Sequence, residues 1–163
     1  MSARRQQRQS FGGKTLEDVI RCLKLKRFTI ITHADFIKRR RDLLSKDTDR
    51  WLVKNLPYTT IYGTPGRREY FVETEEWSGQ LECKYQNVGG SVDEKMVYVT
   101  ETLRRTDVKS LMLVYAGQYW SRGRGAAIIR WLYDEQINLA REGKCLAVAT
   151  LDEFIDWANA TWD

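Results

Sequence analysis

The clearest alternation of apolar and polar positions lies in residues 81–86. Leucine, cysteine and tyrosine there alternate with an acid, a cation and an amide, which are Glu82, Lys84 and Gln86. A period of two is typical of a β-strand, because successive side chains point to opposite faces. The pattern predicts a strand with a row of charged and polar groups on one face.

A second strand is predicted at residues 67–72, around Phe71 and Val72. Trp-Ser-Gly-Gln at 77–80 supplies turn-forming residues, so the two strands are expected to pair as a hairpin. Such a hairpin would set Glu69 beside Glu82. Two adjacent carboxylates repel each other unless a divalent cation lies between them, and their hard oxygens suit Mg²⁺ or Mn²⁺.

The remaining apolar spacing predicts helices and further buried strands. Helices are expected over 15–24, with Gly12 and Gly13 limiting the first, over 34–56, over 91–105 with Ser91 as N-cap, up to Glu142, and from a cap at Asp152. Strands are expected over 110–116 and 145–149. This order predicts an α/β fold, with a mixed central β-sheet flanked by helices.

Composition supports one folded domain. The chain has 163 residues, of which 42% are hydrophobic, enough to bury a core. Residues 1–41 hold 12 Lys or Arg against three acids, whereas acids predominate in the remainder. Residues 1–12 are expected to be a flexible basic arm and residues 13–163 a single domain. The arm would contact phosphate or be a plain solvated tail.

The single histidine and the cysteines exclude several classes. Nucleases of the histidine-metal type and most zinc hydrolases need more than His33. Cys22, Cys83 and Cys145 are widely separated, which argues against a disulfide framework. No stretch has the length of a membrane span and no signal-peptide core follows the first arginines. An intracellular, cytoplasmic protein without membrane contact is therefore expected.

The segment Glu82-Cys83-Lys84 resembles the (D/E)XK element of the PD-(D/E)XK nuclease superfamily, whose fold is restriction-endonuclease-like. Glu69 would be the upstream acid and Gln86 follows the lysine. Residues 89–95 look like the glycine-led start of the next helix. Members usually have Pro-Asp at the first acid, whereas this chain has Arg68-Glu69, with a longer acid in place of the aspartate. The match covers roughly residues 66–95.

The resemblance implies a Mg²⁺- or Mn²⁺-dependent endonuclease that hydrolyses DNA phosphodiester bonds, of the phage-type, homing or restriction-like kind. Glu69, Glu82 and a backbone carbonyl near Cys83 would hold the metal. Lys84 would orient the attacking water, and Gln86 would position the lysine or a phosphate oxygen. Glu17 resembles the N-terminal helix acid of many members, although a first-turn glutamate is also favoured by the helix dipole. The small size suggests a homodimer if the protein cuts both strands.

Basic and aromatic residues elsewhere suggest how DNA would be held. The loop over 117–125 interleaves glycines with aromatic side chains and arginines, which suit base stacking and phosphate contact. A flexible strand-to-helix connection is the alternative reading of that loop. The candidate nucleic-acid contacts are Arg4, Arg5, Arg8, Arg39, Arg40, Arg67, Arg68, Ser91, Lys95, Tyr119, Arg122 and Arg124.

Three other interpretations stay open from the sequence. Glu-x-Lys on a half-exposed strand also occurs as an ordinary surface pair. A non-catalytic nucleic-acid-binding module could keep the same fold. A structure-specific junction nuclease or an RNA-processing nuclease would share the same site.

Overall fold

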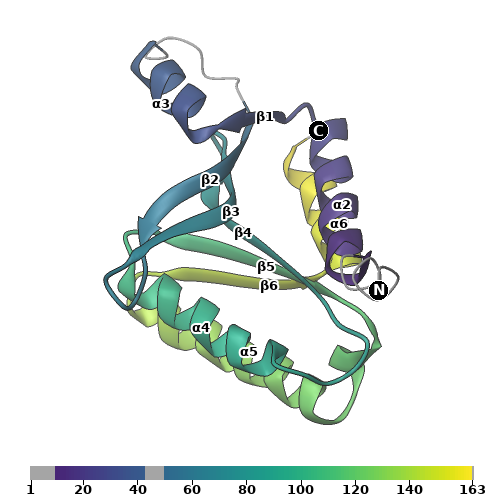
Figure 1. Ribbon diagram of the computed structural model, residues 1–163. Helices are drawn as coiled ribbons and strands as arrows, with labels where there is room; N and C mark the ends of the chain where they lie inside the picture. Colours follow the sequence, from purple (N-terminus) through teal and green to yellow (C-terminus); the bar gives the residue numbers. More distant parts are fainter. Residues whose placement is uncertain (1–9, 43–49, 163) are drawn as a thin grey trace, which may run out of the picture.

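A mixed β-sheet organises residues 10–42 and 50–162, the part of the chain that the computed structural model describes (Figure 1). Within these residues six strands lie in the order of the sequence. Strands β2, β3 and β4 form an antiparallel meander, and β1, β5 and β6 add in parallel. The predicted α/β fold is confirmed. The strands are β1 (Thr29–Thr32), β2 (Trp51–Thr59), β3 (Pro65–Glu73), β4 (Ser78–Tyr85), β5 (Ser110–Ala116) and β6 (Cys145–Thr150).

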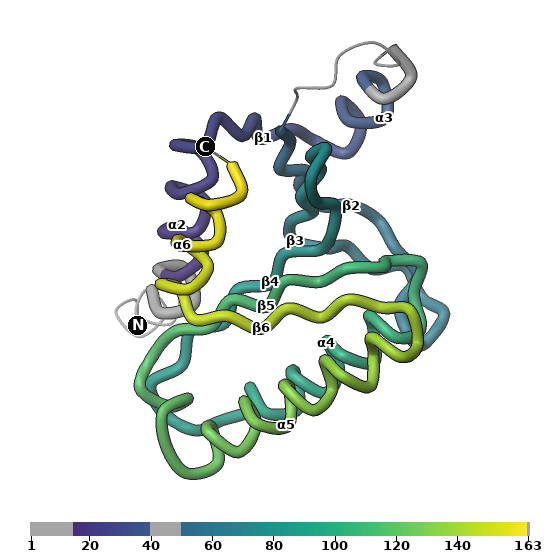
Figure 2. The backbone as a smooth tube through the Cα atoms, turned by 180° about the vertical axis from the view of Figure 1, so that it is seen from behind, coloured from purple at the N-terminus to yellow at the C-terminus, as the bar shows by residue number. Residues whose placement is uncertain are grey.

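Helices cover both faces of this sheet. Figures 1 and 2 show α2 and α6 side by side on one face, α4 and α5 on the other, and α3 beside the β1 end. Among the described helices, none combines the length and the apolar character that a bilayer-spanning helix needs. The helices are α2 (Ser10–Leu25), α3 (His33–Asp42), α4 (Val92–Arg105), the 3₁₀ helix η1 (Gln118–Ser121), α5 (Gly123–Arg141) and α6 (Leu151–Thr161).

Two apolar cores follow from strict alternation along β5. Met112 and Val114 face a core closed by α2 and α6, whereas Leu111 and Leu113 face a core closed by α4 and α5. Burial on both faces is typical of parallel strands and gives the continuous apolar run Leu-Met-Leu-Val. Each fully buried side chain of this size contributes about 1.5–3 kcal/mol.

Strands β3 and β4 pair over only part of their length. Their register ends at the pair Tyr70 and Leu81, whereas β3 continues along β2 as far as the pair Thr59 and Pro65. Beyond Leu81, β4 pairs with β5 alone. Figure 1 shows β3 and β4 running apart. The sheet therefore opens a fork between its two central strands.

The helix predicted over 34–56 is wrong in its second half. Helix α3 has its last residue at Asp42, and residues 51–59 form β2. Trp51, Leu52 and Val53 are consecutive buried residues, because β2 is covered on both faces. Such a run has no period of two and resembles a buried helix segment. Strand β1, which β2 joins in parallel, was not predicted.

Several predicted boundaries also move. The hairpin turn lies at Thr74–Trp77, where the Thr74 amide donates to the Trp77 carbonyl at 3.0 Å, so 78–80 belong to β4. Helix α2 already begins at Ser10, before the two glycines. Thr150, not Asp152, caps α6 through a capping box with Glu153.

Two further predictions concern the segments that precede α4 and α5. Ser91 holds the N-cap position of α4, but its side chain makes no capping hydrogen bond. The loop over 117–125 is ordered, because it contains η1 and the first turn of α5.

A close backbone contact ties the end of β4 to η1, and it yields a first prediction. Gly117 has φ +106°, and a Cβ there would meet the Gln86 carbonyl oxygen at 2.2 Å. Gly117→Ala is therefore expected to lower the free energy of unfolding by about 3 kcal/mol or more, from backbone strain plus overlap. Gly143→Ala is the control, since φ is +75° but the space is open, and should cost about 1 kcal/mol. Equal losses in urea unfolding would contradict this contact.

Candidate active site

Two carboxylates meet at the fork. Glu69 precedes Tyr70 on β3 and Glu82 follows Leu81 on β4, so each acid lies one residue beyond the last pair, at the place where the strands diverge. The Glu69 side chain reaches solvent, and neighbouring protein atoms shield its carboxyl in part. This partial desolvation, together with the charge of Glu82, raises the pKa of Glu69. The two acids are thus close enough to repel each other.

Glu82 is held through both of its oxygens. Gln80 donates from Nε2 to Oε1 at 2.8 Å, and Lys84 donates from Nζ to Oε2 at 2.8 Å. The Glu82 and Lys84 side chains are 14% and 22% exposed, so the ion pair is partly shielded from water. Hydrogen bonds to a charged carboxylate are short and strong, and two of them fix its orientation.

Arg68 lies behind the site and is buried, at 2% exposure. Its guanidinium donates to Gln80 and, at 3.0 Å, to Asp107, and it stacks 4.5 Å from the centre of the Tyr58 ring. The sequence predicted that Arg68 contacts DNA. Its burial and these partners argue against that role, because a phosphate has no access to the guanidinium.

Cys83 lies between the two site residues of β4. Burial, and then the charges of Glu82 and Glu69, raise the pKa of its thiol to about 12. The thiol therefore stays protonated at neutral pH, and only a thiolate is a good metal ligand. A hard cation at this position would meet the backbone carbonyl of Cys83 instead.

Gln86 and Glu17 are the two remaining predicted site residues. Gln86 is one residue beyond β4, and its amide donates to the Val88 carbonyl at 2.5 Å. Glu17 is exposed on α2. Among the described residues, the charges that shift the pKa of Glu69 are Glu82, Lys84 and Lys54, and Glu17 is not one of them.

Apart from Arg68, the predicted DNA contacts fall into three groups. Tyr119 and Arg124 both bond to Asp93, the first through its hydroxyl at 2.7 Å and the second through Nε at 2.6 Å. The aromatic neighbour Trp120 is buried, at 4% exposure, and cannot stack on a base. Exposed positions are held by Arg39, Arg67, Ser91, Lys95 and Arg122. Outside the described residues lie Arg4, Arg5 and Arg8, and outside the described side chains lies Arg40.

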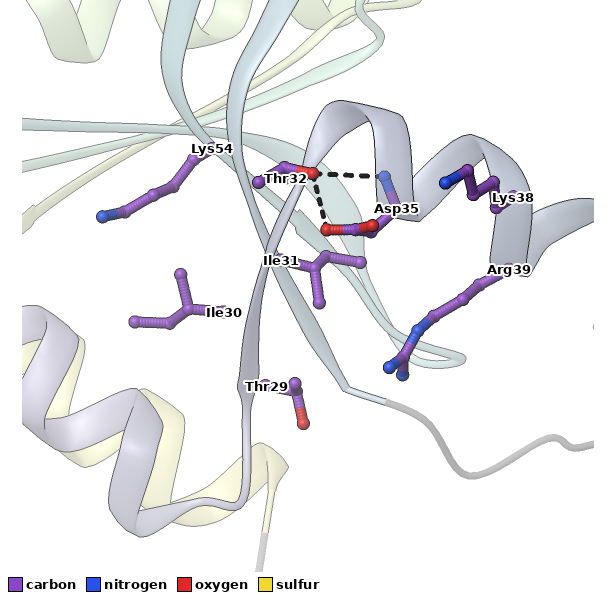
Figure 3. A pocket seen from close by; sticks show the side chains of 8 residues that line it. All are labelled: Thr29, Ile30, Ile31, Thr32, Asp35, Lys38, Arg39 and Lys54. Atoms are coloured by element: carbon purple, nitrogen blue, oxygen red, sulfur yellow. Dashed lines mark hydrogen bonds between the residues drawn. The ribbon is translucent and has the colours of Figure 1, made fainter.

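Lys54 is a site residue that the sequence did not suggest. It lies on β2 opposite Tyr70, with its ammonium 5.8 Å from the ring centre, and its charge lowers the pKa of Glu69. Figure 3 shows Lys54 across a pocket from Lys38 and Arg39 of α3. Lys54 also lines a neighbouring pocket that includes Arg67. The sequence predicted a helix for this segment, so Lys54 was not expected near Glu69.

The residues at the fork fit a divalent cation. Glu69 and Glu82 offer hard carboxylate oxygens, and the mutual repulsion of the pair is the charge pattern that a dication relieves. Within residues 10–42 and 50–162 no cluster of three or more His, Cys, Asp or Glu is placed to hold a metal. Two carboxylates suffice for Mg²⁺, which keeps several water ligands.

The comparison with protein families agrees with this geometry. The family described as PD-(D/E)XK nuclease superfamily domain matches residues 9–162. The chain belongs to this superfamily. Curated proteins give no significant match, and neither do solved structures.

The raised pKa of Glu69 gives a second prediction. Glutamate in an unfolded chain has a pKa of about 4.3, so Glu69 keeps its proton to a higher pH in the folded state, where its pKa is raised. Stability should then fall as pH rises from that value through the folded pKa. Glu69→Gln removes this loss and should be more stable than the parent at pH 7.5 by roughly 0.5 kcal/mol, allowing for solvent screening. The gain should vanish near pH 4. Urea unfolding at both pH values measures it, and a gain independent of pH contradicts it.

Proposed function

We propose that the protein is a Mg²⁺- or Mn²⁺-dependent endonuclease that hydrolyses phosphodiester bonds in DNA. The observation that carries the proposal is the meeting of Glu69, Glu82 and Lys84 at the fork. Membership of a nuclease superfamily supports it. The three residues are also those of the superfamily's sequence motif, with glutamate as the first acid.

Each residue has a separate role in this proposal. Glu69, Glu82 and the Cys83 carbonyl would hold the cation, which lowers the pKa of a water and offsets charge on the phosphate when bound. Lys84 binds Glu82 through one donor. An ammonium carries three donors, so Lys84 can hold Glu82 and the attacking water together. Gln86, whose amide faces the loop, is left out of the chemistry.

The basic side chains near the fork supply a path for the DNA backbone. Lys38, Arg39 and Lys54 line one pocket, and Arg67 joins Lys54 in the next. Lys54 is common to both pockets and influences Glu69, so the path would lead into the carboxylates. Such contacts bind phosphate without reading sequence.

A third prediction tests the chemistry. Supercoiled plasmid should be cut with Mg²⁺ and left intact with EDTA, and Glu82→Gln and Lys84→Met should each lower the rate at least 100-fold. Glu73→Gln is the matched control, because Glu73 lies on β3, the strand of Glu69, but accepts a hydrogen bond from Ser78 at the far end of the hairpin. Loss of cutting in Glu73→Gln together with full activity in Glu69→Gln would indicate that Glu73, and not Glu69, is the second acid.

The products of the same assay separate the other possibilities. Binding without cutting, in the parent protein with either metal, would favour the non-catalytic module. A panel of duplex, junction, single-stranded DNA and RNA substrates distinguishes the structure-specific and RNA-processing alternatives. Linear product formed without prior nicking would support the proposed homodimer. Phage origin and an intracellular location stay predictions.

A fourth prediction concerns binding. Arg39→Ala and Arg67→Ala should each weaken duplex binding and reduce the slope of log affinity against log salt by roughly 1. With one phosphate contact fewer, DNA binding releases fewer counterions. Arg105→Ala is the control, since Arg105 is exposed on α4 and pairs with Glu101. Fluorescence anisotropy with catalysis blocked by Ca²⁺ measures the slope. An equal change in all three variants would indicate that the DNA does not follow the path past Arg39 and Arg67.

A further inference from the structure

Gln80 links the candidate site to the interior of the sheet. It lies two residues before Glu82 on the same face of β4 and is only 5% exposed. Its Nε2 donates to Glu82 Oε1 at 2.8 Å, and its Oε1 accepts from Arg68 Nε at 3.2 Å. Both ends of the amide are therefore used, one by a carboxylate and the other by a cation.

Arg68 determines which way this amide points. A guanidinium can only donate hydrogen bonds, so the Gln80 oxygen must face Arg68 and the NH₂ group must face Glu82. Arg68 is itself fixed, because it donates to Asp107 at 3.0 Å and to the Pro57 carbonyl at 3.4 Å and packs over Tyr58. The bonds thus run in one direction, from a buried cation through a neutral amide to the carboxylate.

We propose that Gln80, oriented by Arg68, is a positioning residue that holds the Glu82 carboxylate in the geometry that binds the divalent cation. The inference rests on the proposed function of Glu82 as a metal ligand. Gln80 is too buried to touch DNA, so it acts through Glu82 alone. Its NH₂ uses one lone pair of Oε1 and leaves another for the cation.

The neutral charge of the Gln80 amide also suits a site that binds a cation. A bond from a neutral amide adds no charge that competes with the cation for Glu82, unlike a second lysine. The nearby positive charge of Arg68 polarises the amide and strengthens its donation in a low dielectric. While Lys84 shares its donors between Glu82 and a water, Gln80 holds the other oxygen of Glu82 in place.

The test compares two glutamines that each donate a side-chain hydrogen bond. Gln80→Met keeps the length of the side chain and removes the donor, and Gln136→Met is the matched control, because Gln136 donates to the Leu146 carbonyl at 2.9 Å away from the fork. Gln80→Met should weaken Mn²⁺ binding in calorimetry about tenfold and lower kcat on plasmid by a similar factor, with KM for DNA unchanged. Gln136→Met should stay within about twofold of the parent in all three measurements.

A second variant serves if Gln80→Met does not fold. Gln80→Asn keeps the amide but is one methylene too short to reach Arg68 and Glu82 together, so a smaller loss of Mn²⁺ affinity in the same direction is expected. Parental Mn²⁺ affinity and parental kcat in either folded Gln80 variant overturn the proposal. These results leave the proposed function intact if Glu82→Gln abolishes both Mn²⁺ binding and DNA cutting. A parent protein that binds no Mn²⁺ and cuts no DNA overturns the proposed function, and this inference with it.

Discussion

The fork between β3 and β4 is the constraint on which the site depends. A strand that leaves its neighbour must keep its backbone groups paired elsewhere, because unpaired buried amides and carbonyls are costly. On its other side each strand stays paired, β3 with β2 and β4 with β5. These ladders hold both strands in place, while the alternate backbone groups that face the gap have no partner among the described strands and must bond to water or a ligand instead. In a continuous pair, opposed side chains would lie about 4.5–5.5 Å apart and two acids there would destabilise the sheet.

The charges around the fork are arranged in two layers. Near the opening, the two acids are balanced by Lys84 and Lys54, which oppose the effect of Glu82 on the pKa of Glu69. Behind them lies Arg68, whose burial lowers its pKa while the nearby charge of Asp107 acts in the opposite sense. Asp107 is largely exposed, at 89%, so this is no fully buried ion pair and the aspartate keeps its hydration. The acids remain the electrostatically unfavourable element, which suits a site that binds a cation.

The sequence predicted the chemistry of β4 better than its extent. Alternation alone placed Glu82 and Lys84 on one face, because that rule is local to a strand. Gln80 obeys the same rule, but it was predicted to belong to the turn, together with residues 77–79. Gly79 is required for another reason, since a Cβ there would meet the Ser110 carbonyl oxygen at 2.7 Å. Lys54 was missed for a different cause. The buried run Trp51-Leu52-Val53 before it has no period of two, so the segment was predicted to be helical.

The position of Arg68 shows why the motif does not define the whole site. Under strict alternation Arg68 would share a face with Tyr70, which packs beneath α2 and α6. Instead Arg68 lines a pocket with Phe71, three residues away, so the alternation breaks between them. The partner strand breaks at the same level: Asn55 has φ +55°, and the pairing passes from Lys54–Tyr70 to Leu56–Arg68. Asparagine tolerates this left-handed conformation better than most residues. The break on both strands coincides with the turn of the Arg68 side chain toward Gln80, on the face of β4 that carries Glu82.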